Sequence, residues 1–275
     1  RIFTFGFLKQ PVGRTRYAAM TNEQGVVIDD GVSCRLADDH FYVTATTSGV
    51  GRVFQSMLQW NAQWRLDVDI ANVTSAFAAV NIAGPLSRQV LETVCTGVDL
   101  SAQALPYLEL REGYAGDAPA RLMRTGFVGE LSYELHVPAR YGEYLWDLLM
   151  EAGKAFGIRP FGVEAQRLLR LEKGHVIIGQ DTDGMSHPGE IGMSWAVNRT
   201  KPFFVGRRAV DILDEQPAKR RLVGFQLPAG SAKPMEGHLV LDGTDITGNV
   251  TSCEYSTTQN AIIGLAYAGA DKAPP

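Results

Sequence analysis

Short runs of β-branched and aromatic residues alternate in this chain with segments of helical periodicity, and no other feature constrains the fold more strongly. Between residues 145 and 152, apolar residues recur at i, i+3, i+4 and i+7, which predicts an amphipathic helix. Pro85 opens a second predicted helix at 86–94, because proline is favoured in the first helical turn. Strands are predicted at 26–28, 41–46, 66–73, 77–82, 121–124 and 132–137, the last two as an antiparallel pair. The mixture predicts an α+β fold of antiparallel sheets and helices.

A domain boundary is expected between residues 208 and 209. A helical segment at 209–214 leads to Gln216-Pro217, and beyond it short strands follow closely, separated by glycine turns. Such spacing is typical of a small antiparallel barrel or sandwich. We therefore expect one domain at 1–208 and a small C-terminal β-barrel at 209–275. Because the chain starts in an apolar run without methionine, we expect it to be a segment of a longer polypeptide, with both domains incomplete.

Composition argues against several classes of function. The formal net charge of -4, with 26 dispersed lysine and arginine residues, gives no broad positive field for a nucleic-acid backbone. No apolar run approaches the roughly 20 residues of a membrane span. The three cysteines lie far apart and the five histidines show no paired spacing, so we expect neither a disulfide framework nor a metal site. A cytoplasmic protein fits this pattern. The Gly-x-Gly at 49–51 lacks the third glycine of a dinucleotide fingerprint.

Three stretches bring carboxylates together with basic or amide side chains, and they are the candidate site. One runs over 17–30 and one over 126–135, each ending a largely hydrophobic β-like run in acidic residues. The third runs over 167–184 and surrounds an apolar helical seam that ends at Gly174. This crowding of polar groups beside apolar runs indicates a binding or catalytic site.

The local sequence alone leaves the role of these carboxylates open. Asp29 and Asp30 follow an apolar run and precede Gly31, where the chain is expected to leave the core, and Asp-Gly is a common turn pair. Glu134 lies in a run in which apolar and polar residues alternate. It can therefore equally well be an exposed strand residue with a solvated carboxylate or a functional residue.

The three stretches resemble the folate-binding module of the aminomethyltransferase family, the glycine cleavage T-protein and its relatives. The resemblance implies a folate-binding domain followed by a barrel, with tetrahydrofolate as cofactor. The spacing of 13 residues from Tyr17 to Asp30 matches the family, in which this aspartate lies beside the reactive amine nitrogens of tetrahydrofolate. Asp30 is therefore the expected catalytic residue, and Tyr17 is expected beside the cofactor. A carboxylate there can stabilise a cationic iminium or accept a proton.

The resemblance also assigns four further residues to the cofactor. Glu134 matches the glutamate that binds the pterin, whose amino group and adjacent ring N–H one carboxylate can accept together. Phe127 stands where the family usually has tyrosine, so stacking would survive but a phenolic hydrogen bond would not. Arg170 is expected either to bind the ligand or to brace the site, and a salt bridge to a nearby glutamate is the alternative. Trp195 is expected near the folate cavity, although a core aromatic is the ordinary interpretation.

Five short phrases, in order, resemble the C-terminal portion of the alpha subunit of heterotetrameric sarcosine oxidase and related secondary-amine dehydrogenases. They lie at 12–17, 29–36, 82–88, 137–142 and 179–184. This resemblance implies that a flavin elsewhere in the complex oxidises an N-methyl amine and that the imine or formaldehyde meets tetrahydrofolate here. Flavin and NAD are then expected only elsewhere in the complex, with other subunits or domains as partners. A glycine cleavage T-protein and a scaffold module that has lost folate are the two alternatives.

Overall fold

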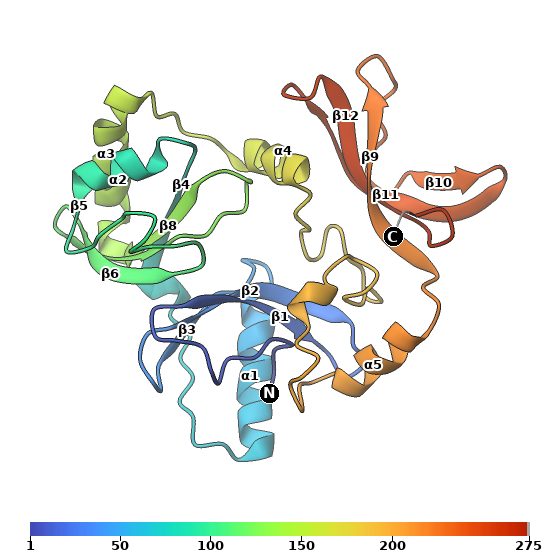
Figure 1. Cartoon of the computed structure of the whole chain (residues 1–275), viewed down its shortest axis with the longest axis horizontal. Coiled ribbons are helices and arrows are strands. Elements are labelled where there is room, and N and C mark those ends of the chain that lie inside the picture. The colour runs from blue at the N-terminus through green and yellow to red at the C-terminus, as the bar shows by residue number, and fades with distance from the viewer. Residues whose placement is uncertain (274–275) are drawn as a thin grey trace.

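The computed structural model describes residues 1–273 and contains three antiparallel sheets with five α-helices (Figure 1). The expected α+β class is confirmed. The first sheet has the order β1-β2-β3 and consists of β1 (Thr15–Thr21), β2 (Val27–Arg35) and β3 (Phe41–Val43). The second has the order β4-β8-β7-β6-β5 and consists of β4 (Phe77–Ala83), β5 (Cys95–Thr96), β6 (Leu110–Ala115), β7 (Ala118–Met123) and β8 (Ser132–Pro138).

The two faces of the five-stranded sheet differ, because side chains alternate along each strand. One face packs on α2 (Ser87–Val94) and α3 (Gly142–Gly153) through the largest apolar cluster, which includes Tyr133, Leu135 and Val137 of β8. The opposite face of β8 carries Ser132, Glu134 and His136. Both helices and the pairing of β7 with β8 agree with the sequence prediction.

One predicted strand in the N-terminal half is wrong. The expected strand at 66–73 is irregular and mostly exposed, and it has no neighbouring strand with which to pair. It follows α1 (Val50–Trp64), a helix that was not predicted from the sequence. Of the interpretations left open for Asp29-Asp30-Gly31, the turn is excluded, because β2 continues through these residues to Arg35. Gly31 is required there for another reason, since a Cβ atom would lie 2.1 Å from the carbonyl oxygen of Thr44.

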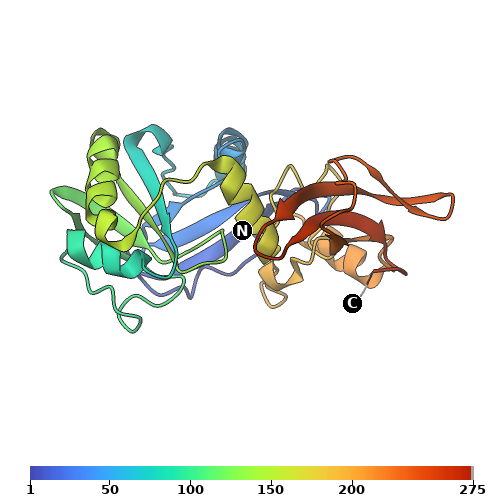
Figure 2. The same cartoon turned by 90° about the horizontal axis from the view of Figure 1, so that it is seen from above.

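The C-terminal part begins with α5 (Arg207–Glu215) and continues as a four-stranded sheet of order β10-β11-β12-β9. Its strands are β9 (Arg220–Pro228), β10 (Leu239–Asp242), β11 (Asp245–Ser256) and β12 (Ala261–Gly269). The helix α4 (Val163–Lys173) ends at Gly174, whose φ of 80° suits glycine, and it packs on β11 and β12. Figures 1 and 2 show α4 between the five-stranded sheet and the C-terminal strands. The expected C-terminal domain includes residues 274–275, which lie outside the described residues.

Candidate functional site

The face of the three-stranded sheet that carries Asp30 packs toward the polar face of the five-stranded sheet. Alternation along β2 places Asp30 on the same face as Val32 and Cys34. Cys34 lies in a buried cluster with Met123 of β7, and their sulfur atoms are 3.2 Å apart. Met123 is in turn the direct cross-strand neighbour of Glu134. The two expected site carboxylates therefore lie on facing surfaces of two sheets.

Tyr17 and Asp30 form a hydrogen-bonded pair on adjacent strands. Tyr17 of β1 is opposite Val32, one pleat from Asp30, so its hydroxyl reaches diagonally and donates to Asp30 Oδ2 at 2.5 Å. Burial raises the pKa of Asp30 to about 6, with a further rise from the charge of Asp29, although the Tyr17 hydrogen bond acts in the opposite direction. Burial and the Asp30 charge also raise the pKa of Tyr17, so the phenol remains a donor. A carboxyl group of this kind can exchange a proton near neutral pH.

Asp29, although adjacent, has a different task. Its side chain points to the opposite face of β2 and is buried, and its carboxylate accepts hydrogen bonds from the backbone N–H groups of Asp30 and Thr46 and from the Thr46 hydroxyl. The Thr46 hydroxyl oxygen accepts from the N–H of Gly49, directly before α1. A Cβ atom on Gly49 would lie 1.5 Å from Asp29 Oδ2. Asp29 thus fixes the entry into α1 and leaves Asp30 as the carboxylate available for chemistry.

Trp195 lies beside the Tyr17–Asp30 pair. Its ring is 4.9 Å from that of Tyr17, and the short 3-10 helix that carries it, Ser194–Ala196, packs on β1. The residue is 62% exposed, so the interpretation of Trp195 as a core aromatic is wrong. An exposed indole beside the partly buried Tyr17–Asp30 pair offers a flat surface on which an aromatic ligand can stack.

Glu134 retains capacity to accept hydrogen bonds from a ligand. Its side chain is 33% exposed, and its Oε2 lies 3.5 Å from Nε2 of His136. The cross-strand neighbours of Glu134 are Asn81 and Met123, neither of which carries a charge. A partly exposed carboxylate between uncharged neighbours fits the two-point recognition expected for a pterin.

His136 and Tyr42 were not among the candidates drawn from the sequence. The Tyr42 hydroxyl lies 2.9 Å from His136 Nδ1, so the two residues join β3 to β8. The spacing of two along β8 could have indicated that His136 shares a face with Glu134. No local signal could have indicated Tyr42, because it comes from another sheet.

Phe127 lies in the loop between β7 and β8 and contacts His175. Their rings stack with centroids 5.7 Å apart, and His175 Nδ1 donates to the carbonyl oxygen of Phe127 at 2.7 Å. The ring of Phe127 thus already has an aromatic partner, on the segment that follows α4.

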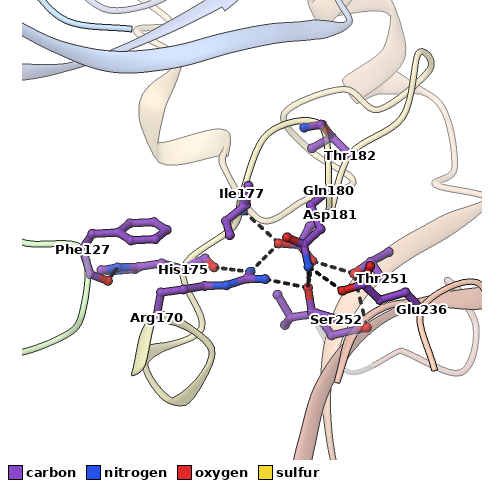
Figure 3. A network of polar contacts seen from close by, with 12 residues as sticks. Phe127, Arg170, His175, Ile177, Gln180, Asp181, Thr182, Glu236, Thr251 and Ser252 are labelled. Carbon is purple, nitrogen blue, oxygen red and sulfur yellow. Dashed lines mark hydrogen bonds and ion pairs between the residues drawn. The ribbon is translucent and has the colours of Figure 1, made fainter. Parts of the chain in front are cut away.

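Arg170 is buried in a polar network that joins α4 to the C-terminal sheet (Figure 3). It forms an ion pair with Asp181 and donates to the carbonyl oxygen of His175 at 2.9 Å and to the hydroxyl of Ser252 at 2.6 Å. Asp181 also accepts from Thr251 at 2.7 Å and Ser252 at 2.5 Å. Both terminal nitrogens of Arg170 are engaged and the side chain is 1% exposed, so of its two expected roles the geometry favours bracing. Its partner is Asp181, and not one of the nearby glutamates of α4.

Two surface hollows of the described residues lie away from the expected site residues. One, of about 400 Å³, is open and lies beside α5, lined by Trp60, Phe203 and Arg207 among others. Among residues 1–273, no group of three or more His, Cys, Asp and Glu side chains is placed to hold a metal ion. Over the same residues, no helix is long and apolar enough to cross a membrane.

Comparison with known proteins assigns the chain to a family. The model of the GCVT N-terminal domain matches residues 1–201, and that of the glycine cleavage T-protein C-terminal barrel domain matches residues 220–274. The chain belongs to the aminomethyltransferase family. This family binds tetrahydrofolate, and the expected domain boundary at 208/209 lies between the two matched regions.

The relatives include two kinds of protein. The chain is 33% identical to an aminomethyltransferase of Halothermothrix orenii, over 100% of this chain and 75% of that protein. It is 38% identical to sarcosine oxidase subunit alpha of Corynebacterium sp. (strain P-1), over 97% of this chain but only 29% of the relative's length. The chain also superposes on a crystal structure of glycine cleavage system aminomethyltransferase T from Bartonella henselae, with a TM-score of 0.82 and 22% sequence identity. The superposition covers 96% of this chain and 70% of that chain. The two proteins therefore share a fold.

Proposed function

We propose that this chain captures a one-carbon unit on tetrahydrofolate, with Glu134 holding the pterin and Asp30 assisting the transfer. The donor is the imine or formaldehyde produced when an N-methyl amine such as sarcosine is oxidised at a flavin elsewhere in a larger complex. Similarity to sarcosine oxidase subunit alpha over nearly the whole chain supports this donor. We place the protein in the cytoplasm, since its three cysteines are free thiols.

The observation that carries the proposal is the Tyr17–Asp30 pair, with its hydrogen bond of 2.5 Å and the pKa of Asp30 raised to about 6. A purely structural carboxylate gains nothing from an elevated pKa, because burial then only disfavours its charged form. An acid-base group gains from it, because the most effective catalytic pKa lies near the working pH.

Bound tetrahydrofolate would supply the amine nitrogens that take up the carbon, giving 5,10-methylenetetrahydrofolate. Asp30 in its ionised form stabilises positive charge on the incoming carbon-nitrogen centre and accepts the proton that the attacking amine releases. Tyr17 holds the Asp30 carboxylate in place by donating to Oδ2. Trp195 offers its exposed ring to the ligand, and the stacked pair of Phe127 and His175 borders the site on the side of α4. Arg170 holds the backbone at His175 in place by donating a hydrogen bond to its carbonyl oxygen.

The test is the partition of product in the Asp30→Asn variant of the complete enzyme. The amide keeps the shape of the side chain and can still accept from Tyr17, so reduced folate should bind nearly as well as to the wild type. The rate of methylenetetrahydrofolate formation should fall by about 10²-fold or more, the usual contribution of a positioned acid or base. Amine oxidation should continue with release of free formaldehyde. A wild-type ratio of methylenetetrahydrofolate to formaldehyde would refute the role of Asp30.

A glycine cleavage aminomethyltransferase is the second candidate, favoured by the 33% identity that extends over 75% of the Halothermothrix orenii protein. Its donor would be an aminomethyl group on a lipoyl carrier protein. Supplying the purified protein with the aminomethylated carrier separates the two functions, since only this second candidate would release ammonia from it. A scaffold module without folate is distinguished by a titration with reduced folate, which would then show no binding.

A further inference from the structure

His136 lies between the hydroxyl of Tyr42 and the carboxylate of Glu134, in a partly buried chain of polar contacts. Its Nδ1 is 2.9 Å from the Tyr42 oxygen and its Nε2 is 3.5 Å from Glu134 Oε2. The side chain of His136 is only 8% exposed, whereas that of Glu134 is 33% exposed. The buried imidazole therefore contacts the more exposed carboxylate of Glu134.

The chemistry of the two end groups determines where the imidazole hydrogen lies. A carboxylate can only accept a hydrogen bond, so Nε2 must carry the hydrogen that faces Glu134. A phenol hydroxyl can donate, so Tyr42 donates to Nδ1 and holds the ring in the tautomer with hydrogen on Nε2. Both ring nitrogens of His136 are then satisfied in an almost fully buried position, as burial requires.

Packing holds Tyr42 and His136 in fixed positions. The guanidinium of Arg121 lies 4.8 Å from the ring of Tyr42 and 4.9 Å from that of Phe77, while its Nε donates to Glu112 at 3.1 Å. The rings of Tyr42 and His136 meet edge to face at 88°. Arg121 is also the direct cross-strand neighbour of His136. The contacts that support the imidazole thus come from three strands.

We propose that His136 is a positioning residue that fixes the carboxylate of Glu134 for recognition of the folate pterin. It occupies one acceptor position of Oε2 and leaves Oε1 and the remaining lone pair of Oε2 for the two N–H groups of a pterin edge. The inference rests on the proposed function, because it presumes that Glu134 binds the pterin. His136 itself touches no ligand, so its effect on affinity must pass through Glu134.

The experiment is a double-mutant cycle on the dissociation constant of 5-formyltetrahydrofolate, a stable reduced folate, measured by calorimetry on the purified protein. His136→Leu should weaken binding by about 5- to 10-fold, on the scale of a hydrogen bond to a charged group. His136→Gln, whose Nε2 can take the place of the imidazole Nε2, should recover most of the loss, whereas His136→Asn, whose amide is too short, should not. Tyr42→Phe, which removes only the hydroxyl, should weaken binding by about 2- to 4-fold, as a lost neutral hydrogen bond would.

The decisive comparison is made in a Glu134→Ala background, which removes the group that His136 contacts. There His136→Leu should have almost no further effect, because residues that act through each other are not additive. An equal loss in both backgrounds would overturn the positioning role, even with Glu134 retained as the pterin anchor. Unchanged affinity in Glu134→Ala alone would instead overturn the proposed anchor. Thermal unfolding of each variant confirms that the protein is folded at the titration temperature.

Discussion

Replacing Asp30 by asparagine should stabilise the protein, and the gain should grow with pH. Burial moves the pKa of Asp30 from its ordinary value of 3.8 to about 6 in the folded state. Each unit of such a shift is worth about 1.4 kcal/mol of free energy. Above pH 6 the carboxyl is ionised in both states, so its burial costs about 3 kcal/mol of unfolding free energy.

The sign follows from proton binding. Between pH 3.8 and 6 the folded state binds more protons at this residue than the unfolded state, so the free energy of unfolding falls as pH rises. Asparagine is neutral throughout and carries no such dependence, while its side-chain oxygen can still accept from Tyr17. We therefore expect Asp30→Asn to raise the free energy of unfolding by about 1 kcal/mol at pH 4.5 and by about 3 kcal/mol at pH 8.

Urea denaturation of wild type and variant at these two pH values, followed by tryptophan fluorescence, measures the difference directly. Other titrating groups are common to both proteins and cancel. Asp29→Asn is the matched control, because Asp29 accepts three hydrogen bonds and the amide can satisfy fewer of them. That variant should be less stable than wild type by roughly 1–2 kcal/mol. A gain for Asp30→Asn that does not change with pH, or a loss at pH 8, would refute the assignment of a raised pKa to the partly buried Asp30 carboxyl.

Three further changes test other parts of the structure. Glu134→Ala should weaken binding of reduced folate by roughly 2 kcal/mol or more in calorimetry, as a charge-assisted hydrogen-bond pair is lost; unchanged affinity would contradict the anchor. Arg170→Met should lower the free energy of unfolding by about 3–5 kcal/mol, because the Asp181 carboxylate is left buried and uncompensated. Adding Asp181→Asn to this variant should recover part of the loss. Equal stability of Arg170→Met and wild type in urea would argue against a bracing role for Arg170. Gly31→Ala should leave little folded protein by circular dichroism, because its Cβ would lie 2.1 Å from Thr44 oxygen, and a normally folded variant would contradict the close packing of β2.

The sequence predicted those elements whose own residues determine them. The helix α3 shows a complete apolar stripe, and the strands β7 and β8 alternate clearly, so both were predictable. The segment 66–73 has strand-like composition, yet the fold offers it no partner strand, and composition cannot report a missing partner. The helix α1 begins at residues held by Asp29, a contact between positions 17 apart that no local pattern contains.

The candidate site was predictable only in part, for the same physical reason. The resemblance to the family, which the spacing of Tyr17 and Asp30 matches, placed both residues in the candidate site, and a hydrogen bond joins their side chains. Asp29 has a structural role and Asp30 faces the candidate site because of which face of β2 meets the second sheet, and the local sequence does not indicate that face. Tyr42 and His136 come from different sheets, so their contact depends on tertiary packing alone.

The network around Arg170 also limits the order in which this chain can fold during synthesis. Asp181 leaves the ribosome 70 residues before Thr251, and Arg170 leaves it 82 residues before Ser252; the hydroxyls of Thr251 and Ser252 are the donors that complete the hydrogen bonding of the aspartate. Until β11 has been made, the ion pair lacks part of its hydrogen bonding and is poorly suited to burial. Segment 174–186 is therefore ordered late, after strand β11 has docked. Under the proposed function, a truncation that removes the C-terminal sheet would loosen this segment and with it one border of the folate site.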